Sequence, residues 1–328
     1  MKRIPVRQAV GSVLCHDITR ILPGEVQEVA FKKGHVVREE DIPELLRLGK
    51  DHIYAWEPQP GKVHEDEAAI RIARAAARSG VELGEPSEGK VELYARHPGV
   101  LRVNVEALRR VNSIDQVTLV TRRSHDPIDH GGAQVAAARV IPLVIDEEKI
   151  EEVERVCAEF GGILEVSPYV IRRVGIVVTG SEVYYGRIQD GFAPVLREKF
   201  SRLGCEVMGV AYAPDDQGMI AEKIRRFVDE GAELVVATGG MSVDPDDRTP
   251  GAIKAAGAEV VSYGAPVLPG NMFLVAYLGD VPVLGLPGCV MFKDVTAFDY
   301  LVPRVLAKER LTKADIVELG HGGLLRPC

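Results

Sequence analysis

Three short glycine-containing turns have the residue types and spacing of a backbone that binds a ligand. They are Thr179-Gly180-Ser181-Glu182, Thr238-Gly239-Gly240-Met241-Ser242 and Pro287-Gly288-Cys289. Because glycine has no side chain beyond hydrogen, the backbone at such a turn can approach a ligand closely and present its N–H groups. The simpler alternative is that these glycines only permit tight turns. The positions of the three turns relative to one another decide between these interpretations.

Each turn directly follows a short apolar run, at residues 174–178, 234–237 and 282–286. The runs are rich in β-branched residues and lack polar alternation, which is typical of strands buried on both faces of a parallel sheet. In such sheets ligands bind beyond the carboxyl ends of the strands, where the connections diverge. The sequence therefore predicts one crevice lined by all three turns.

Residues 172–310 alternate strand and helix signals around these runs. Apolar residues recur at helical spacing before Gly204 and before Gly231, and again from about Met291 to Lys308. Glycine commonly ends a helix, which supports the first two boundaries. The alternation predicts a doubly wound, mostly parallel α/β domain with three αβα layers.

The sequence before this domain predicts a smaller α+β region in two parts. Residues 1–60 are predicted to form a small N-terminal α+β unit, and residues 61–171 a β-rich α+β middle region whose strongest strand signal spans 135–145. Residues 311–328 are predicted to form a C-terminal tail. The sequence leaves the role of the middle region open.

Two groups of titratable residues in the first 171 positions have competing interpretations. His16 and Asp17 form either a catalytic pair or part of a surface turn. The segment 122–132 contains two histidines and two aspartates that could bind a metal: His125, Asp126, Asp129 and His130. Its proline and paired glycines are typical of an exposed loop, which is the alternative. Its arginine pair, Arg122 and Arg123, could reach an anion in a neighbouring crevice.

Composition and charge exclude several classes of protein. The formal net charge of −8 argues against a broad nucleic-acid-binding surface but permits a small anionic ligand held by local N–H groups. No apolar run approaches the roughly 18 residues needed to span a bilayer, and the first residues lack the apolar core of a signal peptide. The five cysteines are scattered without a C-x-x-C pair. A cytoplasmic protein with reduced thiols and no membrane partner is therefore expected.

The motifs of the α/β region resemble, in order, those of the molybdopterin-binding domain of molybdenum cofactor biosynthesis proteins. Thr179-Gly180-Ser181-Glu182 resembles the family's T-G-[DS]-E, and Asp190 occupies the position of an acidic residue at the next helix start. The remaining matches are Thr238–Ser242 with T/S-G-G-[VT]-[SG], Asp247-Arg248-Thr249-Pro250 with D-x-T-P, Leu268-Pro269-Gly270 with K-P-G, and Leu286-Pro287-Gly288 with L-P-G-[NS]. Each motif is weak alone, and their combination is specific.

The resemblance implies a ligand, molybdopterin or adenylyl-molybdopterin, and a set of residues that contact it. The implied cofactor-binding residues are Thr179, Gly180, Ser181, Glu182, Gly239, Gly240, Ser242, Pro269, Gly270, Pro287, Gly288 and Cys289. Carboxylates beside the ligand's phosphate would repel it unless a bridging Mg²⁺ binds both. Asp247 and Asp190 are therefore predicted to be catalytic, and Asp247, Asp190 and Glu182 to bind Mg²⁺. Cys289 could contact molybdate or sulfur, or could be a buried packing thiol.

Two classes of function follow from the resemblance. The first is Mg²⁺-dependent insertion of molybdate, as in the family's molybdotransferase. Residues 31–49 also resemble the segment that precedes the core domain of that enzyme. The second is a non-catalytic carrier or sensor of the cofactor; adenylyltransferase-like activity is a further alternative. Val267-Leu268 in place of the lysine of K-P-G, and too few residues after 308 for that enzyme's C-terminal domain, favour the second class. The resemblance also implies a homodimer or higher homo-oligomer, with other cofactor biosynthesis proteins as partners.

Overall fold

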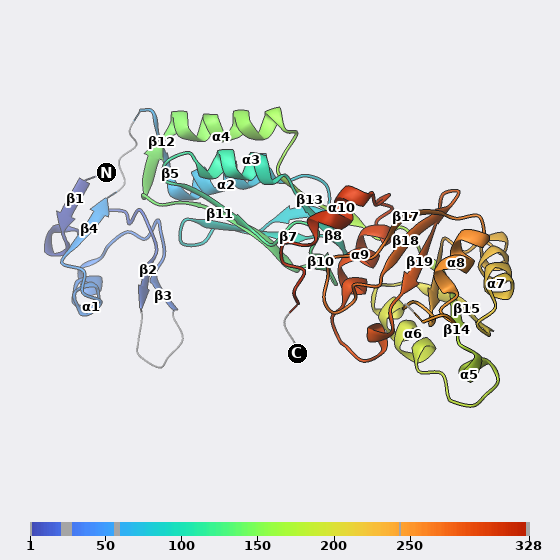
Figure 1. Cartoon of the computed structure of the whole chain (residues 1–328). Coiled ribbons are helices and arrows are strands. Elements are labelled where there is room, and N and C mark those ends of the chain that lie inside the picture. The colour runs from blue at the N-terminus through green and yellow to red at the C-terminus, as the bar shows by residue number, and fades with distance from the viewer. Residues whose placement is uncertain (1, 21–27, 56–59, 243, 326–328) are drawn as a thin grey trace. The chain divides into compact units, whose positions relative to one another are not determined.

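The computed structural model describes residues 2–20, 28–55, 60–242 and 244–325 and divides the chain into two compact units (Figure 1). The first unit comprises Met1–Tyr94, Val103–Arg122 and Gln134–Glu165. The second comprises Ala95–Arg102, Arg123–Ala133 and Val166–Cys328. Three short segments of the predicted middle region, at 95–102, 123–133 and 166–171, therefore belong to the second unit.

Two short antiparallel sheets build the start of the first unit. β1 (Lys2–Pro5) pairs with β4 (His52–Ala55), and β2 (Ile18–Arg20) pairs with β3 (Glu28–Phe31). Three short helical turns complete this part: η1 (Val6–Gln8), η2 (Glu39–Asp41) and α1 (Ile42–Arg47). Val6, Leu14 and Leu45 are buried at its centre, so the residues form a small core of their own.

The rest of the first unit is a four-stranded antiparallel sheet with three helices. The strand order is β6 (Val81–Leu83), β7 (Lys90–Ala95), β11 (Gln134–Val140) and β9 (Val117–Thr121). The helices are α2 (Glu65–Ala76), α3 (Val105–Asn112) and α4 (Glu147–Glu159), and β5 (Lys62–His64) pairs with β12 (Val144–Asp146). The strand predicted over 135–145 is wrong in its extent. It is broken between β11 and β12, where Pro142 has no N–H to donate to a ladder.

A six-stranded sheet forms the centre of the second unit, in the order β15-β14-β16-β19-β18-β17. The strands are β14 (Arg173–Thr179), β15 (Glu206–Ala213), β16 (Leu234–Thr238), β17 (Glu259–Tyr263), β18 (Leu274–Leu278) and β19 (Val281–Leu286). The first four strands of this order run parallel, and β18 pairs antiparallel with both of its neighbours, β19 and β17. A separate three-stranded sheet contains β10 (Pro127–Ile128), β8 (Gly99–Val103) and β13 (Leu164–Pro168).

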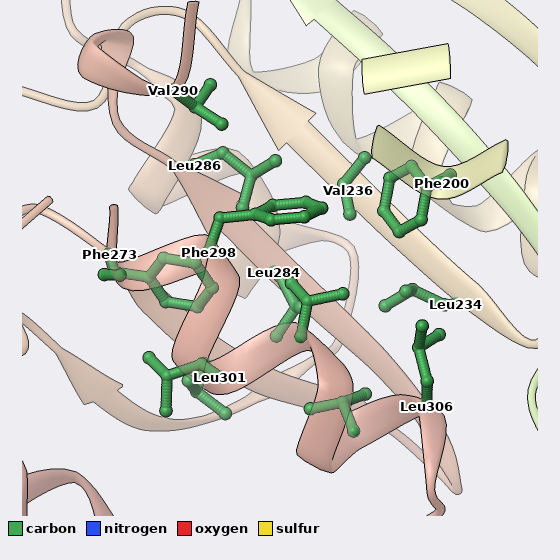
Figure 2. Packing of buried hydrophobic residues seen from close by; sticks show 14 of the residues in the cluster. Phe200, Leu234, Val236, Phe273, Leu284, Leu286, Val290, Phe298, Leu301 and Leu306 are labelled. Carbon is green, nitrogen blue, oxygen red and sulfur yellow. The ribbon is translucent and has the colours of Figure 1, made fainter. Parts of the chain in front are cut away.

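Helices cover both faces of the six-stranded sheet, which confirms the predicted three-layer αβα fold. On one face α6 (Phe192–Arg202) and α9 (Ala297–Leu306) bury Phe200 and Phe298 against Leu284 (Figure 2). On the other face α7 (Gln217–Asp229) and α8 (Thr249–Ala255) pack against Val177. Alternate β14 residues face opposite layers because side chains alternate along a strand.

The predicted C-terminal tail packs into the same core. α10 (Lys313–Glu318) contributes Ile316, and Leu311 and Leu325 are buried in the same cluster as Phe200. The sequence signal was weak because these apolar residues are widely spaced. Among the described residues, no helix is both long and apolar enough to cross a membrane.

Thr296→Ala is expected to lower the free energy of unfolding by about 1 kcal/mol. Thr296 is buried, and its hydroxyl accepts a hydrogen bond from the Phe298 N–H at 3.2 Å. Asp299 completes a capping box by accepting from the Thr296 N–H at 2.7 Å. Urea unfolding measures the loss, and Thr296→Ser, which keeps the hydroxyl, is the control. Equal losses in both variants would contradict a role for the cap.

Candidate functional site

The three glycine turns lie side by side at one edge of the six-stranded sheet. β14, β16 and β19 are adjacent and parallel, with Val178 opposite Thr238 and Thr238 opposite Leu286. The turns begin directly after these residues, so all three occupy the carboxyl edge. The structure therefore brings together the three segments that the sequence assigned to one crevice.

The first two turns are packed against each other closely enough to require glycine. Gly239 has a φ of 93°, and a Cβ built on it would lie 2.1 Å from the Thr179 carbonyl oxygen. The Thr249 hydroxyl donates to the Gly239 carbonyl oxygen at 2.7 Å and lies 2.9 Å from the Thr179 hydroxyl. Thr179 and Thr249 are both buried. Thr179 and Gly239 therefore position the turns through backbone packing.

The second and third turns present N–H groups that are available to a ligand. The N–H groups of Gly240, Met241 and Ser242 donate no hydrogen bond to any residue that the structure describes. The same holds, within those described ranges, for Gly288 and Cys289 at the start of η3 (Gly288–Met291). Successive free N–H groups at neighbouring turns form a concave surface that binds anions.

The N–H groups of the first turn are already used. The Gly180 N–H donates to the Ala213 carbonyl oxygen at 3.1 Å. The Ser181 N–H donates to Asp215 Oδ2 at 2.9 Å, and the Asp215 N–H donates back to Ser181 Oγ at 3.3 Å. Asp215 and β15 therefore satisfy these two donors in this structure, and contact of Gly180 and Ser181 with a ligand stays a prediction.

Asp247 organises the loop after the second turn and retains one oxygen without a described partner. Its Oδ2 accepts a hydrogen bond from the Asp244 N–H at 2.9 Å, and its own N–H donates to the Asp244 carbonyl oxygen at 3.0 Å. Tyr263 holds the preceding turn, since its hydroxyl donates to the Met241 carbonyl oxygen at 2.8 Å and to that of Ser242 at 3.2 Å. Burial and the nearby Asp247 raise the pKa of Tyr263, so its hydroxyl stays protonated. The sequence contained no signal for Tyr263.

Asp190 caps the helix that follows the first turn. Its Oδ1 accepts from the Phe192 N–H at 2.7 Å, and its Oδ2 lies 3.2 Å from the Ala193 nitrogen and accepts from the Tyr212 hydroxyl at 3.0 Å. Both carboxylate oxygens therefore serve the start of α6. Glu182 is exposed on α5 (Ser181–Tyr184), and its carboxylate folds back towards Gly180.

The acidic residues do not form a ready-made metal centre. Across the described ranges, no group of three or more His, Cys, Asp or Glu side chains is close enough to hold a metal ion. Mg²⁺ is commonly bound by one or two carboxylates together with ligand phosphate and water. Asp247, with its free Oδ1, fits that single-carboxylate role better than Asp190, whose oxygens are both engaged.

Pro269 and Gly270 lie against the start of α9. The Pro269 carbonyl oxygen accepts from the Ala297 N–H at 3.1 Å. Gly270 has a φ of 120°, and a Cβ on it would lie 2.7 Å from Ala297 Cβ. These contacts give both residues a packing role, and any contact with a ligand stays a prediction.

Cys289 is half-buried, and burial raises the pKa of its thiol. A raised pKa leaves the sulfur protonated near neutral pH, where it is a poor nucleophile and metal ligand. This property favours the packing interpretation of Cys289. Its backbone N–H, in contrast, remains available at the edge of the sheet.

A groove of about 820 Å³ lies beside the first turn, between α5, α6 and β15. Its lining includes Tyr184, Asp190, Arg197 and Tyr212. Burial and the hydrogen bond to Asp190 raise the pKa of Tyr212, which keeps this hydroxyl protonated. The groove combines aromatic faces with a cation, which suits a flat polar ring. Sequence reasoning missed Arg197 and Tyr212 because helix and strand signals alone do not place them at a cavity.

The other candidate residues of the sequence do not assemble into catalytic or metal sites. Asp17 accepts a hydrogen bond from the Lys33 N–H at 2.7 Å, while His16 Nδ1 lies 3.7 Å from Cys15 Sγ. These separate partners favour the surface-turn interpretation of His16 and Asp17. The histidines and aspartates of segment 122–132 form no metal-binding group of three within the described part of the chain.

Comparisons with known proteins match the part of the chain that contains this site. The family described as "Probable molybdopterin binding domain" matches residues 175–307, and a domain of unknown function matches residues 3–57. A molybdopterin molybdenumtransferase of Synechococcus elongatus is 29% identical over 176 residues, which is 51% of this chain and 44% of that protein. A CinA-like protein of Mycobacterium avium is 38% identical over 80 residues, 24% of this chain and 18% of that protein. The chain thus matches less than half the length of either relative.

Solved structures are also similar to part of this chain. The tungsten cofactor synthesizing protein MoaB of Pyrococcus furiosus is 20% identical, with a TM-score of 0.35, over 43% of this chain and 98% of that one. A molybdopterin biosynthesis protein of Mycobacterium abscessus is 18% identical, with a TM-score of 0.33, over 42% and 94%. The family match agrees with the order of the motifs along the chain and with the position of the three glycine turns at one edge of the sheet. Residues 175–307 belong to the molybdopterin-binding domain family of molybdenum cofactor biosynthesis proteins.

Proposed function

We propose that this chain binds molybdopterin or adenylyl-molybdopterin at the carboxyl edge of β14, β16 and β19. One observation carries the proposal. Gly240–Ser242 and Gly288–Cys289 offer free N–H groups in the turns that follow two adjacent parallel strands. Such groups suit the phosphate of a molybdopterin nucleotide, because oriented N–H dipoles stabilise an anion without requiring basic side chains.

The remaining residues of the edge position this surface. Thr179, Gly239 and Thr249 hold the first two turns together, and Tyr263 fixes the second turn. Asp247, whose Cα lies 3.6 Å from the Cβ position of Gly240, supplies a carboxylate oxygen in the loop that follows the second turn. A Mg²⁺ ion bound there with the ligand would neutralise the repulsion between this carboxylate and a phosphate. The groove at Tyr184 and Tyr212 suits the ring system of the pterin.

Molybdate insertion is the reaction that we propose for this edge. The support is the activity for which the Synechococcus relative is named, together with the available oxygen of Asp247. Asp190 is the less suitable catalytic residue, since both its oxygens cap α6. A non-catalytic carrier or sensor is the second candidate. It is favoured by the use of Asp190 as a cap and by Val267-Leu268 at the K-P-G motif.

Calorimetric titration of the purified chain tests the proposal. Molybdopterin and adenylyl-molybdopterin are each titrated with and without Mg²⁺, and a saturable one-site isotherm is expected for at least one of them. Incubation of the loaded protein with molybdate, followed by metal analysis of the released pterin, then separates an enzyme from a carrier. Absence of binding to both pterins under all four conditions would refute the proposal.

A further inference from the structure

A second cavity lies in the second unit, away from the residues of the glycine turns. Its volume is about 190 Å³, enough for about six water molecules at roughly 30 Å³ each. The walls come from the loop at 123–126, from α9 and α10, and from residues 321–325. None of the residues proposed to bind molybdopterin is among its lining residues.

Arg304 of α9 is a buried cation at this cavity with unused hydrogen-bond donors. The residue is 2% exposed. Its Nε and Nη2 donate to Glu309 at 3.2 and 2.5 Å, and Nη2 also donates to Asp315 at 2.9 Å. Its Nη1 donates to no residue in the described part of the chain. An acceptor in the cavity can therefore take these guanidinium hydrogens in a charge-assisted hydrogen bond.

His125 lines the same cavity and also has a free side chain. Its imidazole forms no hydrogen bond with any described residue. Its backbone is in the left-handed region, with a φ of 70°. Two backbone hydrogen bonds to Leu101 hold the loop in place. The His125 N–H donates to the Leu101 carbonyl oxygen at 2.7 Å, and the Leu101 N–H donates to the Asp126 carbonyl oxygen at 3.0 Å. Burial and the nearby Arg304 lower the pKa of His125, so the neutral ring offers one donor and one acceptor.

The charges around the cavity define the kind of ligand that fits. Arg304 and Arg102 both contact Glu309, the latter at 3.3 Å. The carboxylates of Asp126, Asp315 and Glu318 also line the cavity and would repel a multiply charged anion. The wall also has the polar side chains of Arg123, Ser124, Tyr300 and His321, and its apolar part is formed by Val267, Leu319 and Leu325. A single carboxylate joined to a short apolar chain satisfies both parts of this lining.

We propose that this cavity binds a small organic monocarboxylate, with the carboxylate on Arg304 Nη1 and the His125 imidazole. The apolar part of the ligand packs against Val267 and Leu325. A charge-assisted bond to a guanidinium is among the stronger hydrogen bonds in proteins. This proposal does not require the proposed function of the molybdopterin edge to be correct.

Saturation-transfer NMR of the full-length protein with butyrate tests this site. Butyramide, which has a similar shape and no charge, is expected to bind at least tenfold more weakly than butyrate. Inorganic phosphate is expected to compete poorly with butyrate, because the carboxylates of Asp126, Asp315 and Glu318 repel its higher negative charge. Failure of butyrate to bind, equal binding of the amide, or tighter binding of phosphate would each overturn the proposal.

Two variants locate the bound butyrate. His125→Asn removes the imidazole, and asparagine tolerates a positive φ, so the loop should keep its conformation. This variant is expected to bind butyrate at least fivefold more weakly and to unfold at a temperature close to that of the unchanged protein. Gly288→Pro, at the other site, is expected to leave butyrate binding unchanged. Unaltered butyrate affinity in the folded His125→Asn protein, or a loss caused by Gly288→Pro, would contradict the assignment.

Discussion

Gly288→Pro is expected to weaken molybdopterin binding roughly 10- to 150-fold while the protein remains folded. The substitution removes one backbone N–H that donates to no described residue, and a hydrogen bond to a charged group contributes about 1.5–3 kcal/mol. Proline is tolerated here because Gly288 is the first residue of η3 and Pro287 before it is extended, with a ψ of 156°. A Cβ on Gly288 would meet no atom within 4 Å.

Gly288→Ala is the matched control for this prediction. Alanine adds the same Cβ as proline but keeps the N–H, so the difference between the two variants isolates the hydrogen bond. Calorimetric titration with molybdopterin gives the three dissociation constants, and thermal unfolding checks the fold. If the alanine and proline variants bind equally well, the Gly288 N–H does not contact the ligand.

Asp247→Asn is expected to reduce Mg²⁺-dependent binding of a molybdopterin nucleotide at least roughly tenfold, about 1.4 kcal/mol. Asparagine keeps an oxygen that can accept the hydrogen bond from the Asp244 N–H, so the loop should persist. It loses the negative charge that makes a carboxylate a good Mg²⁺ ligand. Binding without Mg²⁺ should stay the same or improve, because the repulsion between the carboxylate and the phosphate is removed.

Asp244→Asn is the control for Asp247→Asn, since it makes the same change of charge in the same loop. The Asp244 side chain is exposed and forms no hydrogen bond with a described residue. Titrations of both variants with and without Mg²⁺ separate a metal ligand from a general effect of charge. Equal responses of the two variants to Mg²⁺ would show that Asp247 has no specific role with the ion.

The sequence by itself determined the framework of the second unit. β-branched runs that lack polar alternation predict buried parallel strands, and the structure has them as β14, β16 and β19. Glycines at the ends of these runs predict turns at one edge of the sheet, and the structure places the three turns there. These signals are local, because periodicity and turn residues act within a few positions of one another.

Only the tertiary structure decided which groups at this edge are available. The Ser181 N–H donates a hydrogen bond to the Asp215 carboxylate, 34 residues away in the sequence. The N–H groups of Gly240 and Gly288, in contrast, donate to no described residue. Likewise, His125 reaches the cavity of Arg304 only because segment 123–133 joins the second unit. Hydrogen-bond partners and cavity walls come from chain segments far apart in sequence. Local propensity therefore predicts where the turns occur but not which of their donors another segment has already satisfied.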